Sequence, residues 1–303
     1  MEGKGGQLCM STVFKGSGVA LVTPFTNGEV DYTALTRLIE LQIISGTDAI
    51  IVCGTTGEAA TMTAEERLEV IRFVVERVNR RLPVIAGTGG NNTAAVIEAS
   101  RTAEALGVDG LLIVTPFYNK TTQRGLVAHY GAICEQVHIP IIVYNVPSRT
   151  GLNVLPATMK EIVDTCENVV GIKEASGNIE QIVNLAAMCP GLDIYSGNDD
   201  HILPVLSVGG KGVISTIANV VPSEVHNLCM AFFAGKLDIA RKLQFSLLPI
   251  WRAAFCETNP IPIKTMMSMM DLCSPELRLP LIPPSSENVE KMRKALRDFG
   301  LIS

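Results

Sequence analysis

The chain has 303 residues, of which 47% are hydrophobic, so it can bury a large core in one or two domains. Its formal net charge of -5 disfavours the class of proteins that bind nucleic acid through a basic surface. No apolar run approaches the roughly 18–20 residues of a membrane-spanning helix, so we expect no membrane partner.

The N-terminal segment and the cysteines indicate the compartment. Residues 1–12 have no hydrophobic stretch of a secretory signal and predict a flexible extension. The 8 cysteines form no CxxC pair and no zinc-type cluster with histidine. We therefore expect reduced thiols, a cytoplasmic protein and no bound metal.

Eight short apolar runs recur along the chain, each followed by a polar or glycine-rich loop. The runs are apolar on both faces, which is typical of parallel strands covered on both sides. The predicted strands are Gly18–Val22, Ala49–Val52, Val84–Ala86, Gly110–Val114, Ile141–Tyr144, Val169–Lys173, Asp193–Ser196 and Gly212–Ser215.

Longer amphipathic stretches separate these runs and predict helices. One of them opens with a capping box, in which Thr63 is followed three residues later by Glu66. The predicted helices between strands are Val30–Ser45, Thr63–Arg77, Asn92–Leu106, Gln123–Gln136, Leu155–Thr165, Asn178–Met188 and Asp199–Val208. After the last strand, the predicted helices are Pro222–Ala234, Lys236–Cys256, Pro260–Met270 and Ser285–Phe299.

This alternation predicts an α/β fold, a (β/α)8 TIM barrel over residues 13–235. A C-terminal helical region is expected to follow over residues 236–303. A doubly wound open sheet is the alternative, because the pattern alone does not show that the sheet closes.

A lysine ends the sixth predicted strand, where active sites of such barrels gather. Burying an ammonium group is costly, and the neutral amine favoured by an apolar setting is the form that attacks a ketone carbon. Lys173 is therefore a candidate for a Schiff base. The alternative is an ion pair with Glu174, although adjacent strand residues point to opposite faces.

Two further loops carry candidate binding groups. In Gly54–Glu58, the hydroxyls of Thr55 and Thr56 lie between glycines and suit a carboxylate or phosphate, although a simple turn with a helix cap is equally compatible. Tyr144 ends the fifth strand and Arg149 follows it, which suggests an acid/base hydroxyl beside a carboxylate clamp. The alternative is a tyrosine that caps the barrel interior and a solvated arginine.

The loop after the fourth strand carries two adjacent aromatics, Phe117 and Tyr118. Exposed aromatics of this kind indicate contact with a ligand or a second subunit. The glycine-rich loop at 87–91 lacks the spacing of nucleotide-binding loops, so no nucleotide cofactor is expected.

Taken in order, these loops resemble the dihydrodipicolinate synthase family of the class I pyruvate-dependent aldolases. The resemblance runs from about Gly16 to Leu301. The segments that carry it are GVALVTPF, GTTGE, PVIAGTGGN, VTPFYN, YNVPSRTG, GIKEASGN, SGND, GGKGVIST and TNPIPIK. The pair GTTGE and YNVPSRTG is the most specific, because sialic acid lyases usually carry GSTGE and lack the arginine.

The resemblance implies a condensation of pyruvate with L-aspartate-4-semialdehyde, in the diaminopimelate route to lysine, without a cofactor or metal. It implies that Lys173 forms the imine with pyruvate and that Tyr144 donates and accepts protons. A hydroxyl relay to solvent would consist of Thr55, Tyr144 and Tyr118, with Tyr118 supplied by a neighbouring subunit of a homotetramer built from two dimers.

The resemblance also implies the binding groups. Thr56 and Ile214 would hold the pyruvate carboxylate and imine, and Gly197 would line the pocket. Arg149 would bind the carboxylate of the semialdehyde. Two alternatives are a related lyase acting on a sugar acid or 2-keto-3-deoxy acid, and a ligand-binding barrel without catalysis.

One departure from the family concerns feedback inhibition by lysine. Lysine-sensitive members carry histidines at the positions of Ala64 and Arg67, a glutamate at Ala95 and a tyrosine at Phe117. Only Asn91 and the neighbouring glycines remain suited to the ligand. We therefore expect weak inhibition by lysine.

Overall fold

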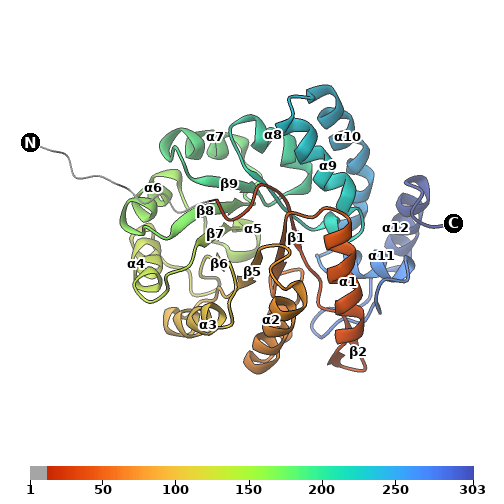
Figure 1. Ribbon diagram of the computed structural model, residues 1–303, viewed down its shortest axis with the longest axis horizontal. Coiled ribbons are helices and arrows are strands. Elements are labelled where there is room, and N and C mark those ends of the chain that lie inside the picture. The colour runs from red at the N-terminus through yellow and green to blue at the C-terminus, as the bar shows by residue number, and fades with distance from the viewer. Residues whose placement is uncertain (1–11) are drawn as a thin grey trace, which may run out of the picture.

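The computed structural model describes residues 12–303, so the predicted extension lies almost wholly outside the described residues. Its centre is a closed barrel of eight parallel strands in the order β1-β10-β9-β8-β7-β6-β5-β4, which excludes the open-sheet alternative (Figure 1). The strands are β1 (Gly16–Ala20), β4 (Ala49–Val52), β5 (Val84–Gly87), β6 (Gly110–Val114), β7 (Ile141–Asn145), β8 (Val169–Glu174), β9 (Asp193–Ser196) and β10 (Gly212–Ser215).

Helices form a ring around the strands, as the (β/α)8 prediction requires (Figure 1). They are α1 (Tyr32–Ile44), α2 (Ala64–Val78), α3 (Thr93–Ala105), α4 (Gln123–Cys134), α6 (Pro156–Thr165), α7 (Ile179–Met188), α8 (Ile202–Ser207) and α9 (Pro222–Phe233). Short 3-10 helices are η1 (Ala59–Thr61), η2 (Asp199–His201) and η3 (Ile217–Asn219).

Three more helices follow the barrel: α10 (Leu237–Ala254), α11 (Ile261–Met269) and α12 (Ser286–Asp298). They lie together on the side of the barrel near α9 and α1, with α10 packed along α9 (Figure 1). None of the helices in residues 12–303 is both long and apolar enough to cross a membrane.

The capping box at the start of α2 forms as predicted. The Thr63 hydroxyl accepts a hydrogen bond from the Glu66 backbone N–H at 3.2 Å, and the Glu66 carboxylate accepts one from the Thr63 N–H at 2.8 Å. Two backbone donors at the helix end are thereby satisfied. These two local hydrogen bonds hold the residues that follow the GTTGE motif to the first turn of α2.

The first strand and the loop after it differ from the prediction. Strand β1 ends at Ala20. The Leu21 N–H still donates to the carbonyl of Ile51 on β4, but the Val22 N–H donates to the Asn219 side chain, and both Leu21 and Val22 remain buried. The last two residues of the predicted strand are therefore apolar because they are buried, although they lie beyond the end of the strand. A small antiparallel hairpin, β2 (Phe25–Thr26) with β3 (Glu29–Val30), and the one-turn helix α5 (Pro147–Thr150) were not predicted.

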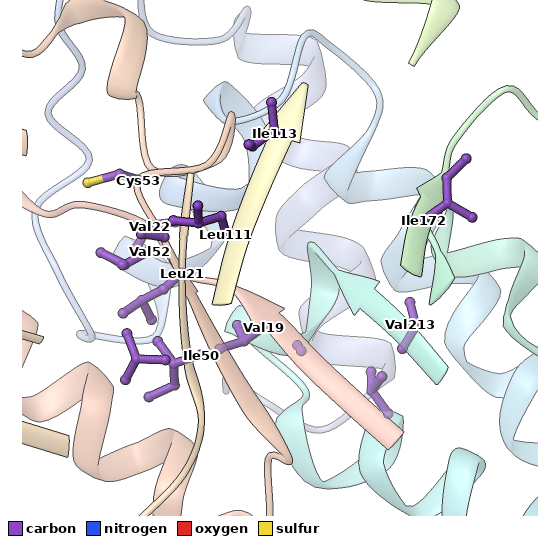
Figure 2. Packing of buried hydrophobic residues seen from close by; sticks show 14 of the residues in the cluster. Val19, Leu21, Val22, Ile50, Val52, Cys53, Leu111, Ile113, Ile172 and Val213 are labelled. Atoms are coloured by element: carbon purple, nitrogen blue, oxygen red, sulfur yellow. The ribbon is translucent and has the colours of Figure 1, made fainter. Parts of the chain in front are cut away.

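Apolar side chains alternate between two layers. Ile50 and Val52 on β4, and Leu111 and Ile113 on β6, belong to the cluster between strands and helices, and Figure 2 shows their side chains. The intervening residues of the same strands, such as Ile51 and Leu112, pack inside the barrel. This alternation on strands covered on both faces explains their uninterrupted apolar sequence.

Candidate active site

Lys173 and Tyr144 lie side by side near the carboxyl ends of neighbouring strands. They are paired in the register of β7 and β8, and both are buried. The Lys173 Nζ lies 4.4 Å from the centroid of the Tyr144 ring. An amine and a phenol, which can attack a carbonyl and move a proton, are thereby adjacent.

The carboxylate of Glu174 is engaged away from Lys173. It accepts hydrogen bonds from the Asn145 side chain at 2.9 Å, the Gln181 side chain at 3.1 Å and the Ser176 N–H at 2.7 Å. Among the ion pairs of residues 12–303, none joins Lys173 to Glu174. The ion-pair alternative is therefore wrong, and the alternation of side chains along β8 explains why.

A cavity of about 580 Å³ opens beside Tyr144, whereas Lys173 is not among its lining residues. Thr55, Tyr144 and Arg149 line it, together with the glycine-rich loop after β5. Three of the predicted site residues therefore share one cavity, although they come from three separate loops or strands. Gly87 is required there, because an added Cβ would lie 2.3 Å from the Cys53 carbonyl oxygen.

Thr56 does not line that cavity but is buried beside it. Its hydroxyl oxygen accepts a hydrogen bond of 2.9 Å from Nδ2 of Asn259. The carbonyl oxygen of Asn259 in turn accepts one of 3.1 Å from Nη2 of Arg149. Sequence reasoning noted the TNPIPIK segment but gave Asn259 no role.

Ile214 and Gly197, two further predicted site residues, do not line that cavity. Ile214 packs inside the barrel in the same cluster as Tyr144. The Gly197 N–H donates to the carbonyl of Glu174 at 2.8 Å, and an added Cβ at Gly197 would lie 2.5 Å from the Cβ of Ala175. Only glycine lets the end of β9 approach β8 this closely.

Asp199 is a second buried residue that received no role from the sequence. Its Oδ2 accepts hydrogen bonds from the backbone N–H groups of Thr216 and Ile217 at 3.1 and 3.3 Å. Burial raises the pKa of this carboxyl to about 6, while these hydrogen bonds and the charge of Lys173 act in the opposite direction. Asp199 thereby fixes the turn that follows Ile214.

The side chain of Tyr118 lies in solvent rather than in the cavity. Its side chain is 92% exposed and does not line the cavity, whereas Phe117 does. Its backbone adopts a positive φ of 70°, which is uncommon for a large residue. Within residues 12–303, no cluster of three or more histidine, cysteine or acidic side chains is arranged to hold a metal ion.

The fold and the site define a class: a (β/α)8 barrel with a lysine and a tyrosine at adjacent strand ends, suited to Schiff-base chemistry. The profile of the Dihydrodipicolinate synthetase family matches residues 13–299. The chain belongs to this family, as the sequence motifs predicted.

Individual relatives agree with this assignment. The chain is 53% identical over 292 residues to a 4-hydroxy-tetrahydrodipicolinate synthase of Clostridium tetani, covering 96% of this chain and 99% of that one. It is 56% identical over 291 residues to the enzyme of the same name from Caldicellulosiruptor bescii, covering 96% and 98%. Among solved structures, it is similar to dihydrodipicolinate synthase from Aquifex aeolicus, with a TM-score of 0.94, 46% identity and coverage of 95% and 99%.

Proposed function

We propose that the chain condenses pyruvate, held as a Schiff base on Lys173, with L-aspartate-4-semialdehyde. The activity that its relatives' names print, 4-hydroxy-tetrahydrodipicolinate synthase, is the activity of this chain, a lyase of lysine and diaminopimelate biosynthesis. The observation that carries the proposal is the pairing of Lys173 with Tyr144 beside a cavity that Arg149 also lines.

The first half-reaction uses Lys173 and Tyr144. The neutral amine adds to the ketone carbon of pyruvate, and loss of water leaves an imine. Tyr144 supplies and removes the protons of these steps, since its ring lies against the amine. Loss of a proton from the methyl carbon then yields the enamine, which is the nucleophile of the second half-reaction.

The second half-reaction needs an oriented aldehyde. Arg149 binds the carboxylate of the semialdehyde from its exposed position on α5, where a guanidinium can make two parallel hydrogen bonds. Thr56 and Ile214 hold the pyruvate carboxylate and imine, and Gly197 leaves room for them. The enamine carbon attacks the aldehyde, and the semialdehyde amine then displaces Lys173 to close the product ring.

Tyr118 completes the site from a second subunit. Its exposure and its absence from the lining of its own chain's cavity fit a side chain that reaches into a neighbour's site. Together with Thr55 and Tyr144 it would form a proton relay to solvent. The proposed assembly is a homotetramer made of two dimers, and the proposed location is the cytoplasm.

Trapping with borohydride tests the proposal. Reduction in the presence of pyruvate converts the imine into a stable amine, whose added mass should be found on Lys173 in a peptide digest. The same preparation should consume semialdehyde only when pyruvate is present. Absence of the adduct, or trapping without condensation, would contradict the proposed reaction.

A further inference from the structure

The segment that begins α11 touches the two residues proposed to hold anions. Asn259 lies 203 residues beyond Thr56 in the chain, yet its Nδ2 is 2.9 Å from the Thr56 hydroxyl oxygen. Its backbone oxygen is 3.1 Å from Nη2 of Arg149. Both Asn259 and Thr56 are buried, so solvent does not compete for their hydrogen bond.

A second contact anchors the same segment to the GTTGE loop. The Nζ of Lys264 lies 2.6 Å from Oε1 of Glu58, and neither side chain is exposed. Lys264 also donates to the carbonyl of Glu276, and Oε2 of Glu58 accepts from the backbone N–H of Arg278. The start of α11 therefore has a fixed position relative to Thr56.

The direction of the Asn259 hydrogen bond determines what Thr56 can do. A threonine hydroxyl has one hydrogen to donate and two lone pairs. Because Asn259 donates to it, one lone pair is occupied while the hydroxyl hydrogen is left for another acceptor. Within residues 12–303, the Thr56 hydroxyl makes no other hydrogen bond.

We infer that Asn259 is a positioning residue of this enzyme, acting through Thr56 and Arg149. Its side chain orients the Thr56 hydroxyl so that the hydrogen points to the carboxylate of the first substrate. Its carbonyl holds the guanidinium that binds the second substrate. The inference rests on the proposed function, since it takes pyruvate and the semialdehyde as the two anions.

The two contacts of Asn259 can be separated, because one uses the side chain and the other the backbone. Asn259→Ala removes the contact with Thr56 and keeps the carbonyl that faces Arg149. The half-saturating pyruvate concentration for borohydride trapping on Lys173 should rise roughly tenfold. The KM for semialdehyde should stay within about twofold of its original value.

Asn259→Asp tests the direction of the hydrogen bond. A carboxylate would accept the Thr56 hydrogen and add a negative charge near the pyruvate carboxylate, so this variant should need more pyruvate than Asn259→Ala. If Asn259 instead accepted a hydrogen from Thr56, the aspartate would preserve that bond and be the milder change. A smaller effect of Asn259→Asp than of Asn259→Ala on the half-saturating pyruvate concentration would overturn the inference.

A double-mutant cycle separates positioning from general damage. In a Thr56→Val background, Asn259→Ala should add less than about twofold to the half-saturating pyruvate concentration. An unchanged tenfold effect in that background would overturn the inference. Asn259→Leu is close in shape to asparagine but has no donor, and it gives an independent variant should the alanine form not fold.

Asn168→Ala is the matched control. Asn168 is also buried and donates to a backbone carbonyl, that of Val137, but it precedes β8 at the opposite end of the barrel. It should lower stability and leave the pyruvate dependence unchanged. Failure of the original enzyme to trap pyruvate would contradict the proposed function itself, whereas normal trapping with an unaffected Asn259→Ala variant would contradict only this inference.

Discussion

Glu58 and Lys264 form a fully buried ion pair, with 2.6 Å between Oε1 and Nζ. The Lys264 ammonium also lies 4.2 Å from the centroid of the Phe25 ring. The pair joins the loop after β4 to the C-terminal helical region. Because both charges are removed from water, each depends on the other for its stability.

We predict that Lys264→Met destabilises the protein by about 3–5 kcal/mol, because it leaves the Glu58 carboxylate buried without its partner. Adding Glu58→Gln should recover part of that loss. Urea unfolding of the original chain, both single variants and the double variant measures the coupling. Additive losses would show that the two charges do not stabilise each other.

The buried lysine at the end of β8 leads to a prediction about catalysis. Lys173→Arg should abolish borohydride trapping of pyruvate and nearly all turnover, since arginine keeps the charge but supplies no neutral amine. The exposed substitution Lys160→Arg on α6 is the control and should leave both unchanged. Substantial turnover by Lys173→Arg would contradict the Schiff-base mechanism.

The strand ends were predictable because a parallel barrel has a strong local pattern. Each apolar run followed by an amphipathic stretch is visible in the sequence, and Lys173 stands out as a charge at the end of such a run. The β2–β3 hairpin has only two residues in each strand, too few to show any periodicity.

Asn259 and Asp199 show what the sequence could not reveal. Asn259 acquires its role from a residue about two hundred positions earlier, and Asp199 from the backbone of the turn that follows β10. Neither contact leaves a local pattern, because each arises only when the chain closes on itself. The TNPIPIK and SGND motifs marked the segments but not their chemistry.

We predict that Arg149 contributes to binding of the semialdehyde and not to binding of pyruvate. Arg149→Ala removes a charge-assisted contact worth about 1.5–3 kcal/mol, so kcat/KM for the semialdehyde should fall roughly ten- to a hundredfold. Trapping of pyruvate on Lys173 should be nearly normal. Arg241→Ala, on the exposed face of α10, controls for loss of charge. An equal loss of pyruvate trapping would mean that Arg149 has a structural role.

Asp199 predicts a pH dependence of stability. Its pKa is about 6 in the folded protein, above the ordinary value of 3.8. The folded state therefore holds the proton more tightly, and stability from this group is present below about pH 3.8 and is lost as pH rises to about 6. The difference amounts to about 3 kcal/mol.

Asp199→Asn isolates that effect, because asparagine can still accept hydrogen bonds from the two backbone N–H groups but does not ionise. Its stability relative to the original chain should improve between pH 4 and pH 7.5, as urea unfolding at both values would measure. The comparison cancels the other titrating groups. If the difference in unfolding free energy between the variant and the original chain were the same at both pH values, ionisation of Asp199 would not destabilise the folded protein.

The last prediction concerns inhibition by lysine. Arg67, Ala95 and Phe117 line the cavity, while Ala64 lies exposed at the start of α2. The Asn91 amide, the remaining suitable group, already donates to the carbonyl of Phe117 at 3.1 Å. A buried lysine zwitterion needs acceptors for its two ammonium groups, and among these side chains only the Asn91 amide oxygen can supply one.

We therefore expect lysine to inhibit poorly. Each missing hydrogen bond costs about 1–3 kcal/mol, so the loss of several lowers affinity by orders of magnitude. The Arg67 charge would favour the ligand carboxylate but oppose its ammonium groups. A rate titration with lysine, paired with calorimetry on the pyruvate-loaded enzyme, measures the effect. Half-inhibition at about 0.1–1 mM, equivalent to roughly -4 to -5.5 kcal/mol of binding, would show that these substitutions leave the lysine site intact.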